Sequence, residues 1–155
     1  MAEQANRKSA NLDGTRLSPT LIVLTDDRAL ADLVAKIIER PWKLVCLSTD
    51  KNKVHKRLAE PNVRIVILDD QAVEENERSW MLAQIRKHFS GSSLLYVAGK
   101  QSDGNEKRAR TNGAHYYVSR PLSPERFGYV LRSFMQVLAK PRELMALKRP
   151  GGDPL

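Results

Sequence analysis

Apolar and polar positions follow two alternating patterns along this chain, and these predict strands and helices in turn. One mostly apolar stretch, residues 63–68, is rich in β-branched side chains and has the length of a strand buried on both faces. It ends abruptly at two acids, Asp69 and Asp70. Shorter runs of the same character predict four more strands, over residues 21–24, 43–47, 94–97 and 115–118.

Between these runs, apolar residues recur every three or four positions, as they do on one face of an amphipathic helix. The first such pattern follows Asp27 and stops before Pro41, through which a helix does not continue. In the last, Ser123 is a typical N-cap and proline takes the first helical position. Further helices are predicted over residues 52–59, over 80–89, and over 106–112 with Gly113 as its C-terminal cap.

The order of these elements predicts the fold class. Strand and helix alternate five times, and right-handed crossovers then build a parallel sheet with helices on both faces, an α/β doubly wound fold. We expect one domain over residues 19–140, a flexible N-terminal arm over 1–18 and a basic C-terminal extension over 141–155. Because that extension is too short for a core of its own, no separate output domain is expected after the sheet.

Composition narrows the class of protein. The chain has 155 residues, 41% of them hydrophobic, which is enough for a packed core. No apolar run approaches the roughly 20 residues of a membrane span, and residues 1–18 lack the apolar region of a secretory signal. The one cysteine, Cys46, rules out an internal disulfide and is interpreted as a buried strand residue. We therefore expect a cytoplasmic protein with no membrane partner.

The net charge of +8 permits binding to nucleic acid or to acidic surfaces. The basic residues are spread, however, over segments 51–57, 107–110 and 140–149, as on solvated helix faces and tails. No nucleic-acid-binding motif is present and few aromatic residues lie between the cations, so nucleic acid ranks last among the expected partners.

Polar residues follow four of the predicted strands where their carboxyl ends meet at one edge of the sheet, the usual place for ligands in such folds. Carboxylates from two adjacent strands with a cation from a third could hold Mg²⁺ and a phosphoryl group. The residues at these ends are Asp26 and Asp27, Asp69 and Asp70, Ala98 and Gly99, and Arg120 and Pro121.

Residues 20–138 resemble the receiver domains of bacterial two-component response regulators. The resemblance rests on residues 21–27 (LIVLTDD), on 66–69 (VILD) and most specifically on 113–125 (GAHYYVSRPLSPE). It implies a flavodoxin-like receiver fold with five strands in the order 2-1-3-4-5. It also implies a signalling protein rather than an enzyme, which takes a phosphoryl group from a histidine kinase or phosphotransfer protein and acts on a downstream protein partner.

The resemblance implies a role for individual residues. Asp69 falls on the phosphoacceptor position, and Asp26 on the second acid of the family's Mg²⁺-binding pair. Thr25 stands where the first acid is expected, so we expect weakened Mg²⁺ binding unless Asp27 reaches the metal. Gln71 falls where the family supplies a backbone carbonyl to the ion.

Three more positions complete the family's pattern. Ala98 replaces the Ser or Thr whose hydroxyl contacts the phosphoryl group, and Arg120 replaces the phosphoryl-contacting lysine. Tyr117 falls on the aromatic residue that changes rotamer as a switch. Arginine is positively charged like lysine, but its guanidinium presents several N–H donors in one plane, whereas the lysine ammonium is a compact point charge. An alternative is therefore that Arg120 pairs permanently with Asp69 and locks the site.

Several alternatives stay open at this point. Asp26 and Asp27 could serve only to cap the first helix, and Tyr117 could be ordinary packing. The domain could be a phosphorylatable receiver or a pseudo-receiver that serves only as an interaction surface. We expect the partner or homodimer surface on the face of the fourth helix, fifth strand and fifth helix, near Tyr117 and Arg126. The basic cluster there is Lys107, Arg108 and Arg110.

Overall fold

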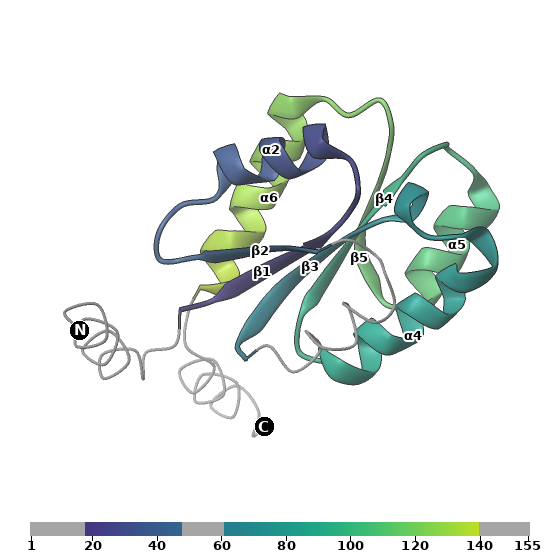
Figure 1. Cartoon of the computed structure of the whole chain (residues 1–155), viewed down its shortest axis with the longest axis horizontal. Coiled ribbons are helices and arrows are strands. Elements are labelled where there is room, and N and C mark those ends of the chain that lie inside the picture. Colours follow the sequence, from purple (N-terminus) through teal and green to yellow (C-terminus); the bar gives the residue numbers. More distant parts are fainter. Residues whose placement is uncertain (1–17, 48–60, 140–155) are drawn as a thin grey trace, which may run out of the picture.

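In the computed structural model, which describes residues 18–47 and 61–139, five strands form one parallel sheet (Figure 1). Their order is β2-β1-β3-β4-β5, which confirms the predicted topology and fold class. The central strand, β3, is buried along its whole length. The strands span Thr20–Leu24 (β1), Lys43–Leu47 (β2), Val63–Asp69 (β3), Ser93–Ala98 (β4) and Ala114–Ser119 (β5).

Helices cover both faces of the sheet (Figure 1). On one face lie α2 (Arg28–Ile37) and α6 (Pro124–Leu138), and on the other lie α4 (Arg78–His88) and α5 (Asp103–Thr111). Two short 3₁₀ helices, Asp70–Ala72 and Glu75–Glu77, connect β3 to α4.

Alternation along the strands divides the interior into two hydrophobic cores. In β3, Ile65 and Ile67 face the core under α2 and α6, whereas Val66 and Leu68 face the core under α4 and α5. Successive side chains of a strand point to opposite faces, so a strand covered on both sides must be apolar throughout. This requirement explains the uninterrupted apolar run over residues 65–68.

Arg64 is a charged residue in this central strand, yet it is only 8% exposed. Its Nη1 donates a hydrogen bond of 2.9 Å to the carbonyl of Leu138, at the C-terminal end of α6. Its Nε donates one of 3.0 Å to Asn62 Oδ1. A cation is favourable at a helix C-terminus, where carbonyl groups lack partners within the helix. Arg64 thereby joins the start of β3 to the end of α6.

Side-chain caps explain where the helices begin. Asp27 accepts a hydrogen bond from the backbone N–H of Ala29 at the start of α2, and Ser123 accepts one from that of Arg126 at the start of α6. Ser102 caps α5, which therefore starts at Asp103, three residues before the predicted start. Gly113 follows that helix with a φ of 99°, which confirms its predicted role as a C-terminal cap.

One sequence-based interpretation was wrong. Cys46 is exposed rather than buried, because β2 is an edge strand in which only Val45 is fully buried. No helix in the described ranges has the length and hydrophobicity needed to cross a bilayer. The helix predicted over 52–59 lies outside the described residues, as do residues 1–17 and 140–155, so the domain limits stay predictions.

Candidate functional site

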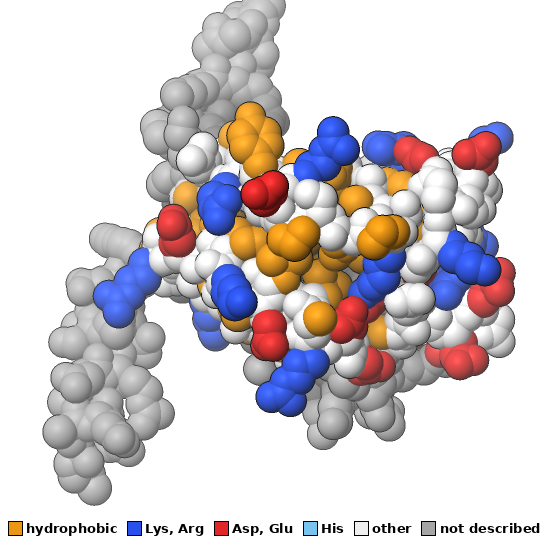
Figure 2. Space-filling view, turned by 90° about the horizontal axis from the view of Figure 1, so that it is seen from above, with side chains coloured by type: hydrophobic (Ala, Val, Ile, Leu, Met, Phe, Trp, Pro, Cys, Tyr) orange, Lys and Arg blue, Asp and Glu red, His pale blue; other side chains and the backbone are white. Residues whose placement is uncertain are grey.

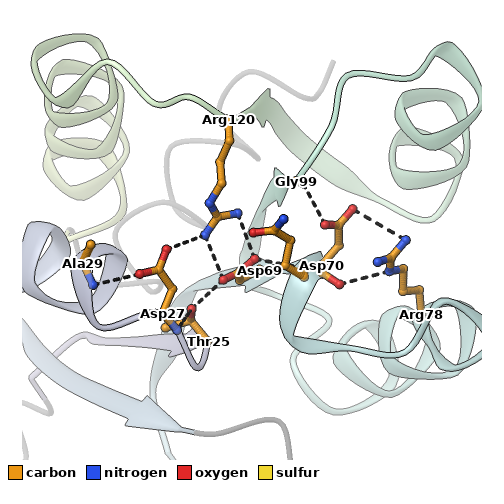
Figure 3. Close-up of polar contacts among 9 residues, drawn as sticks. Thr25, Asp27, Ala29, Asp69, Asp70, Arg78, Gly99 and Arg120 are labelled. Atoms are coloured by element: carbon orange, nitrogen blue, oxygen red, sulfur yellow. Dashed lines mark hydrogen bonds and ion pairs between the residues drawn. The ribbon is translucent and has the colours of Figure 1, made fainter.

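Asp69, the last residue of β3, lies at the carboxyl edge of the sheet with both carboxylate oxygens engaged (Figure 3). Its Oδ2 accepts a hydrogen bond of 2.6 Å from Thr25 Oγ1, and its Oδ1 accepts one of 3.0 Å from the Gln71 backbone N–H. Arg120 donates to both oxygens through its two Nη atoms, at 3.0 and 2.9 Å. The carboxylate is 1% exposed, so these partners enclose it almost completely.

Arg120 follows β5 and reaches back across the sheet edge (Figure 3). Besides the two bonds to Asp69, its Nη2 donates one of 3.0 Å to Asp27 Oδ2. The loop backbone is fixed as well, since the Arg120 N–H donates to the Ala98 carbonyl at 2.9 Å. Burial opposes the charged form of the guanidinium, but the hydrogen bonds to Asp69 and Asp27 outweigh it and raise its pKa. The site therefore contains a permanent internal cation.

Asp27 supplies the second carboxylate of the site from the N-terminus of α2. The hydrogen bond from Arg120, assisted by those from the backbone at Ala29 and Leu30, holds the pKa of Asp27 below its ordinary value. Asp26 is exposed, and within the described ranges no hydrogen bond or ion pair joins it to Asp69 or to Arg120. The structure thus joins Asp27 to Asp69 through Arg120, as the sequence analysis allowed, and leaves Asp26 outside this set of contacts.

This arrangement does not fit Mg²⁺, which needs carboxylate oxygens that face it together with several water or phosphate oxygens. Both oxygens of Asp69 already carry hydrogen bonds, and the positive charge beside them is that of Arg120. Among the side chains that the structure describes, no cluster of three or more His, Cys, Asp or Glu could hold a metal ion. The Arg120 guanidinium, which bonds both oxygens of Asp69, supplies the positive charge at this carboxylate.

The other predicted positions lie around this centre. Ala98 is fully buried in the core under α4 and α5, so its methyl group packs where a hydroxyl was expected. Gln71 donates its backbone N–H to Asp69, and its side chain lies so close to Gly99 that an added Cβ would be 2.5 Å from Gln71 Cγ. Tyr117 is 8% exposed, with its ring packed inward rather than on the surface.

Sequence reasoning missed the contacts of Asp70. This acid points away from Asp69, as the alternation of strand side chains suggests, but it is 2% exposed and fully engaged (Figure 3). Its Oδ1 accepts the Gly99 N–H at 2.9 Å and its Oδ2 accepts the Tyr96 hydroxyl at 3.0 Å. Arg78 donates its Nε to the Asp70 carbonyl at 3.1 Å. The sequence did contain one indication of these contacts. Tyr96 lies within an apolar strand, and a buried phenol hydroxyl needs a hydrogen-bond acceptor such as Asp70.

An open groove runs beside Arg120, between the N-terminal part of α2 and the segment that leads into α6. Apolar side chains form much of its lining. Arg120, 18% exposed, reaches solvent on this side. The lining residues include Asp27, Leu30, Leu33, Gly99, Arg120 and Leu122. Figure 2 shows one face of the molecule, on which hydrophobic side chains gather among charged ones.

Comparison with known proteins agrees with this fold. No protein-family model matches the chain. A response regulator from Thermotoga maritima superimposes with a TM-score of 0.66 at 16% identity, over 77% of this chain and 99% of that one. The beryllofluoride-activated receiver domain dimer of NtrC4 gives 0.64 at 18% identity, over 77% and 98%. The chain has the fold of a response-regulator receiver domain.

A protein with a similar sequence also supports this fold. The aerobic respiration control protein ArcA of Escherichia coli (strain K12) is 22% identical over 107 residues, which are 69% of this chain. The match spans 44% of ArcA, so the chain covers less than half the length of that relative. The receiver fold is thus established for the described residues.

Proposed function

We propose that this protein is a non-enzymatic signalling module that uses the receiver fold as a protein–protein interaction surface, with its phosphoacceptor site held closed by Arg120. The observation that carries the proposal is the pair of hydrogen bonds from Arg120 to the two oxygens of Asp69. Phosphoryl transfer to a carboxylate requires one oxygen to attack phosphorus while a cation steadies the charge that develops. Here both oxygens already carry donors.

The bond from Thr25 strengthens this closure. At 2.6 Å it is a short, charge-assisted contact, and such bonds are roughly twice as strong as neutral ones. Asp27 holds Arg120 from the other side at 3.0 Å and keeps the guanidinium over Asp69. The two carboxylates and one cation form a closed set that no external ion or phosphoryl group has to complete.

The second candidate function is phosphoryl acceptance on Asp69 from a histidine kinase or phosphotransfer protein. The observation that favours it is the groove beside Arg120, which leaves the guanidinium 18% exposed on that side. In that case Asp69 is the only phosphoacceptor, since Asp70 lies on the other side of the strand and is bound to Tyr96 and Gly99.

Association measured with and without a phosphoryl donor tests the first proposal. Sedimentation of the full chain, or capture of an identified partner, is expected to give the same affinity with acetyl phosphate and Mg²⁺ as without them. Asp69→Asn is expected to change this affinity little, because asparagine keeps the size of the side chain and one acceptor oxygen. An affinity that rises with acetyl phosphate in the wild type but not in Asp69→Asn would favour the second candidate.

A further inference from the structure

The core under α4 and α5 contains a run of polar contacts that the closed site does not use. Asp70 accepts the Tyr96 hydroxyl, and the ring of Tyr96 stacks on the ring of Tyr117, with centroids 5.6 Å apart and planes 14° apart. The same carboxylate accepts the backbone N–H of Gly99, the first residue after β4. One buried acid therefore holds the β4–α5 loop and, through Tyr96, a side chain of β5.

The burial of these groups makes the contacts specific. Tyr96 is 1% exposed and Asp70 is 2% exposed, so neither has water to replace a lost partner. Burial is the main cause that raises the pKa of the Tyr96 phenol, and Asp70 raises it further. The hydroxyl therefore stays protonated and remains a donor to Asp70. A buried, hydrogen-bonded network of this kind favours a single arrangement of the groups that form it.

Tyr117 is the exception in this network. Its hydroxyl is buried, yet it makes no hydrogen bond within 3.5 Å to any residue that the structure describes, and only the more distant backbone N–H of Ser102 acts on it to lower its pKa. A buried phenol without a close partner disfavours the inward position of the ring, so other contacts must hold it there. The stacked Tyr96 ring, itself fixed by Asp70, is the contact suited to do so.

We propose that Asp70, Tyr96 and Tyr117 form a buried relay that fixes the β4–α5 loop and keeps Tyr117 turned inward, independently of the state of Asp69. Ala98 offers no hydroxyl at the end of β4, and Asp70 holds the following residue, Gly99, directly. Because Tyr117 shares its core with Ala109 of α5, the relay sets the position of α5 against β5. The inference does not depend on whether Asp69 accepts a phosphoryl group.

Coupling between residues that do not touch tests this relay. Asp70→Ala removes the carboxylate that Gly99 and Tyr96 share, and Tyr96→Phe removes only the hydroxyl. In full-length protein labelled with 3-fluorotyrosine, the ¹⁹F signal of Tyr117 is expected to move toward that of an exposed tyrosine in both variants. Exchange of the Gly99 amide is expected to be about tenfold faster in Asp70→Ala, the factor that corresponds to one lost hydrogen bond.

The double variant separates a relay from two independent effects. If the three side chains act as one unit, Asp70→Ala combined with Tyr96→Phe moves the Tyr117 signal no further than the larger single change does. Tyr116→Phe is the matched control, because its neighbouring ring packs in the opposite core. It is expected to change neither the Tyr117 signal nor Gly99 exchange.

Three results would overturn the relay. The first is a Tyr117 signal that does not move in either single variant. The second is a pair of shifts that add in the double variant. The third is faster exchange by the same factor at Gly99 and at amides of β3, which would show a general loss of stability instead of a local release.

Discussion

At the scale of single residues, the site is determined by the shape of arginine. A guanidinium presents several N–H donors in one plane, so Arg120 bonds both oxygens of Asp69 and still reaches Asp27. A lysine ammonium is a point charge without this planar arrangement. Thr25 contributes a hydroxyl donor where an acid would have added a second negative charge. With these two side chains the site contains its own cation and a neutral donor beside Asp69.

Removal of Arg120 leaves the carboxylate of Asp69 buried without its cation. We expect Arg120→Met to lower the free energy of unfolding by about 3 kcal/mol, the cost typical of a broken buried ion pair. Urea denaturation followed by circular dichroism measures this change. Arg126→Met, at an exposed position of α6, is the matched control and should shift the value by less than about 0.5 kcal/mol. Equal effects of the two substitutions would contradict a stabilising role for the pair.

The lowered pKa of Asp27 predicts how stability depends on pH. Because its folded pKa lies below the ordinary value of 3.8, ionised Asp27 stabilises the fold, and this contribution is complete above that value. It is lost as the pH falls through the lower, folded pKa. The difference in unfolding free energy between wild type and Asp27→Asn should be constant above about pH 5 and should shrink below about pH 4. If the difference in unfolding free energy between wild type and Asp27→Asn grew below about pH 4, it would contradict a lowered pKa for Asp27.

At the scale of elements, the sequence was sufficient for the framework. The periodicities of apolar residues predicted all five strands, and four of the five predicted helices fall within the described residues and are present there. The errors have physical causes. Nothing local distinguishes an edge strand from a central one, so Cys46 was placed in the core. The start of α5 at Asp103 was missed because its first turn is polar and only the Ser102 cap indicates it.

The cap of the last helix gives a prediction at this scale. Ser123 Oγ accepts the Arg126 N–H at the start of α6, and loss of such a cap costs about 1 kcal/mol. We expect Ser123→Ala to lower the unfolding free energy by that amount. Ser133→Ala removes an exposed serine from the middle of the same helix and should have less than half of this effect. If the two variants were equally stable, the cap would not determine where α6 begins.

At the scale of the whole molecule, two consecutive acids connect most of the carboxyl edge. Asp69 reaches the ends of β1 and β5 through Thr25 and Arg120, whereas Asp70 reaches the end of β4 through Tyr96 and Gly99. The sequence could place these groups at one edge, because strand order and alternation determine that much. It could not predict which donor each oxygen binds, since this depends on side-chain positions that only the packed structure determines.

The outer face of α5 carries the predicted interaction surface. Arg110 is paired with Glu106 one turn away at 3.0 Å, and Arg108 donates to Asn105 Oδ1 at 2.6 Å. Replacement of both arginines by glutamate should weaken association, most visibly at low salt. Charges at the rim of an interface mainly change the association rate, and salt screens this effect. Sedimentation at two salt concentrations, with circular dichroism to confirm the fold, measures this effect. If association were unchanged at both salt concentrations, this face of α5 would not be the interaction surface.

The measurement that tests the closed site most directly is the intact mass of the protein after incubation with acetyl phosphate and Mg²⁺. We expect wild-type protein to gain no phosphoryl group, because Arg120 and Thr25 donate hydrogen bonds to the oxygens of Asp69. A variant with Thr25→Asp, Ala98→Thr and Arg120→Lys should gain one, and that gain should be lost when Asp69→Asn is added. An acyl phosphate on Asp69 of the wild-type protein would contradict the account.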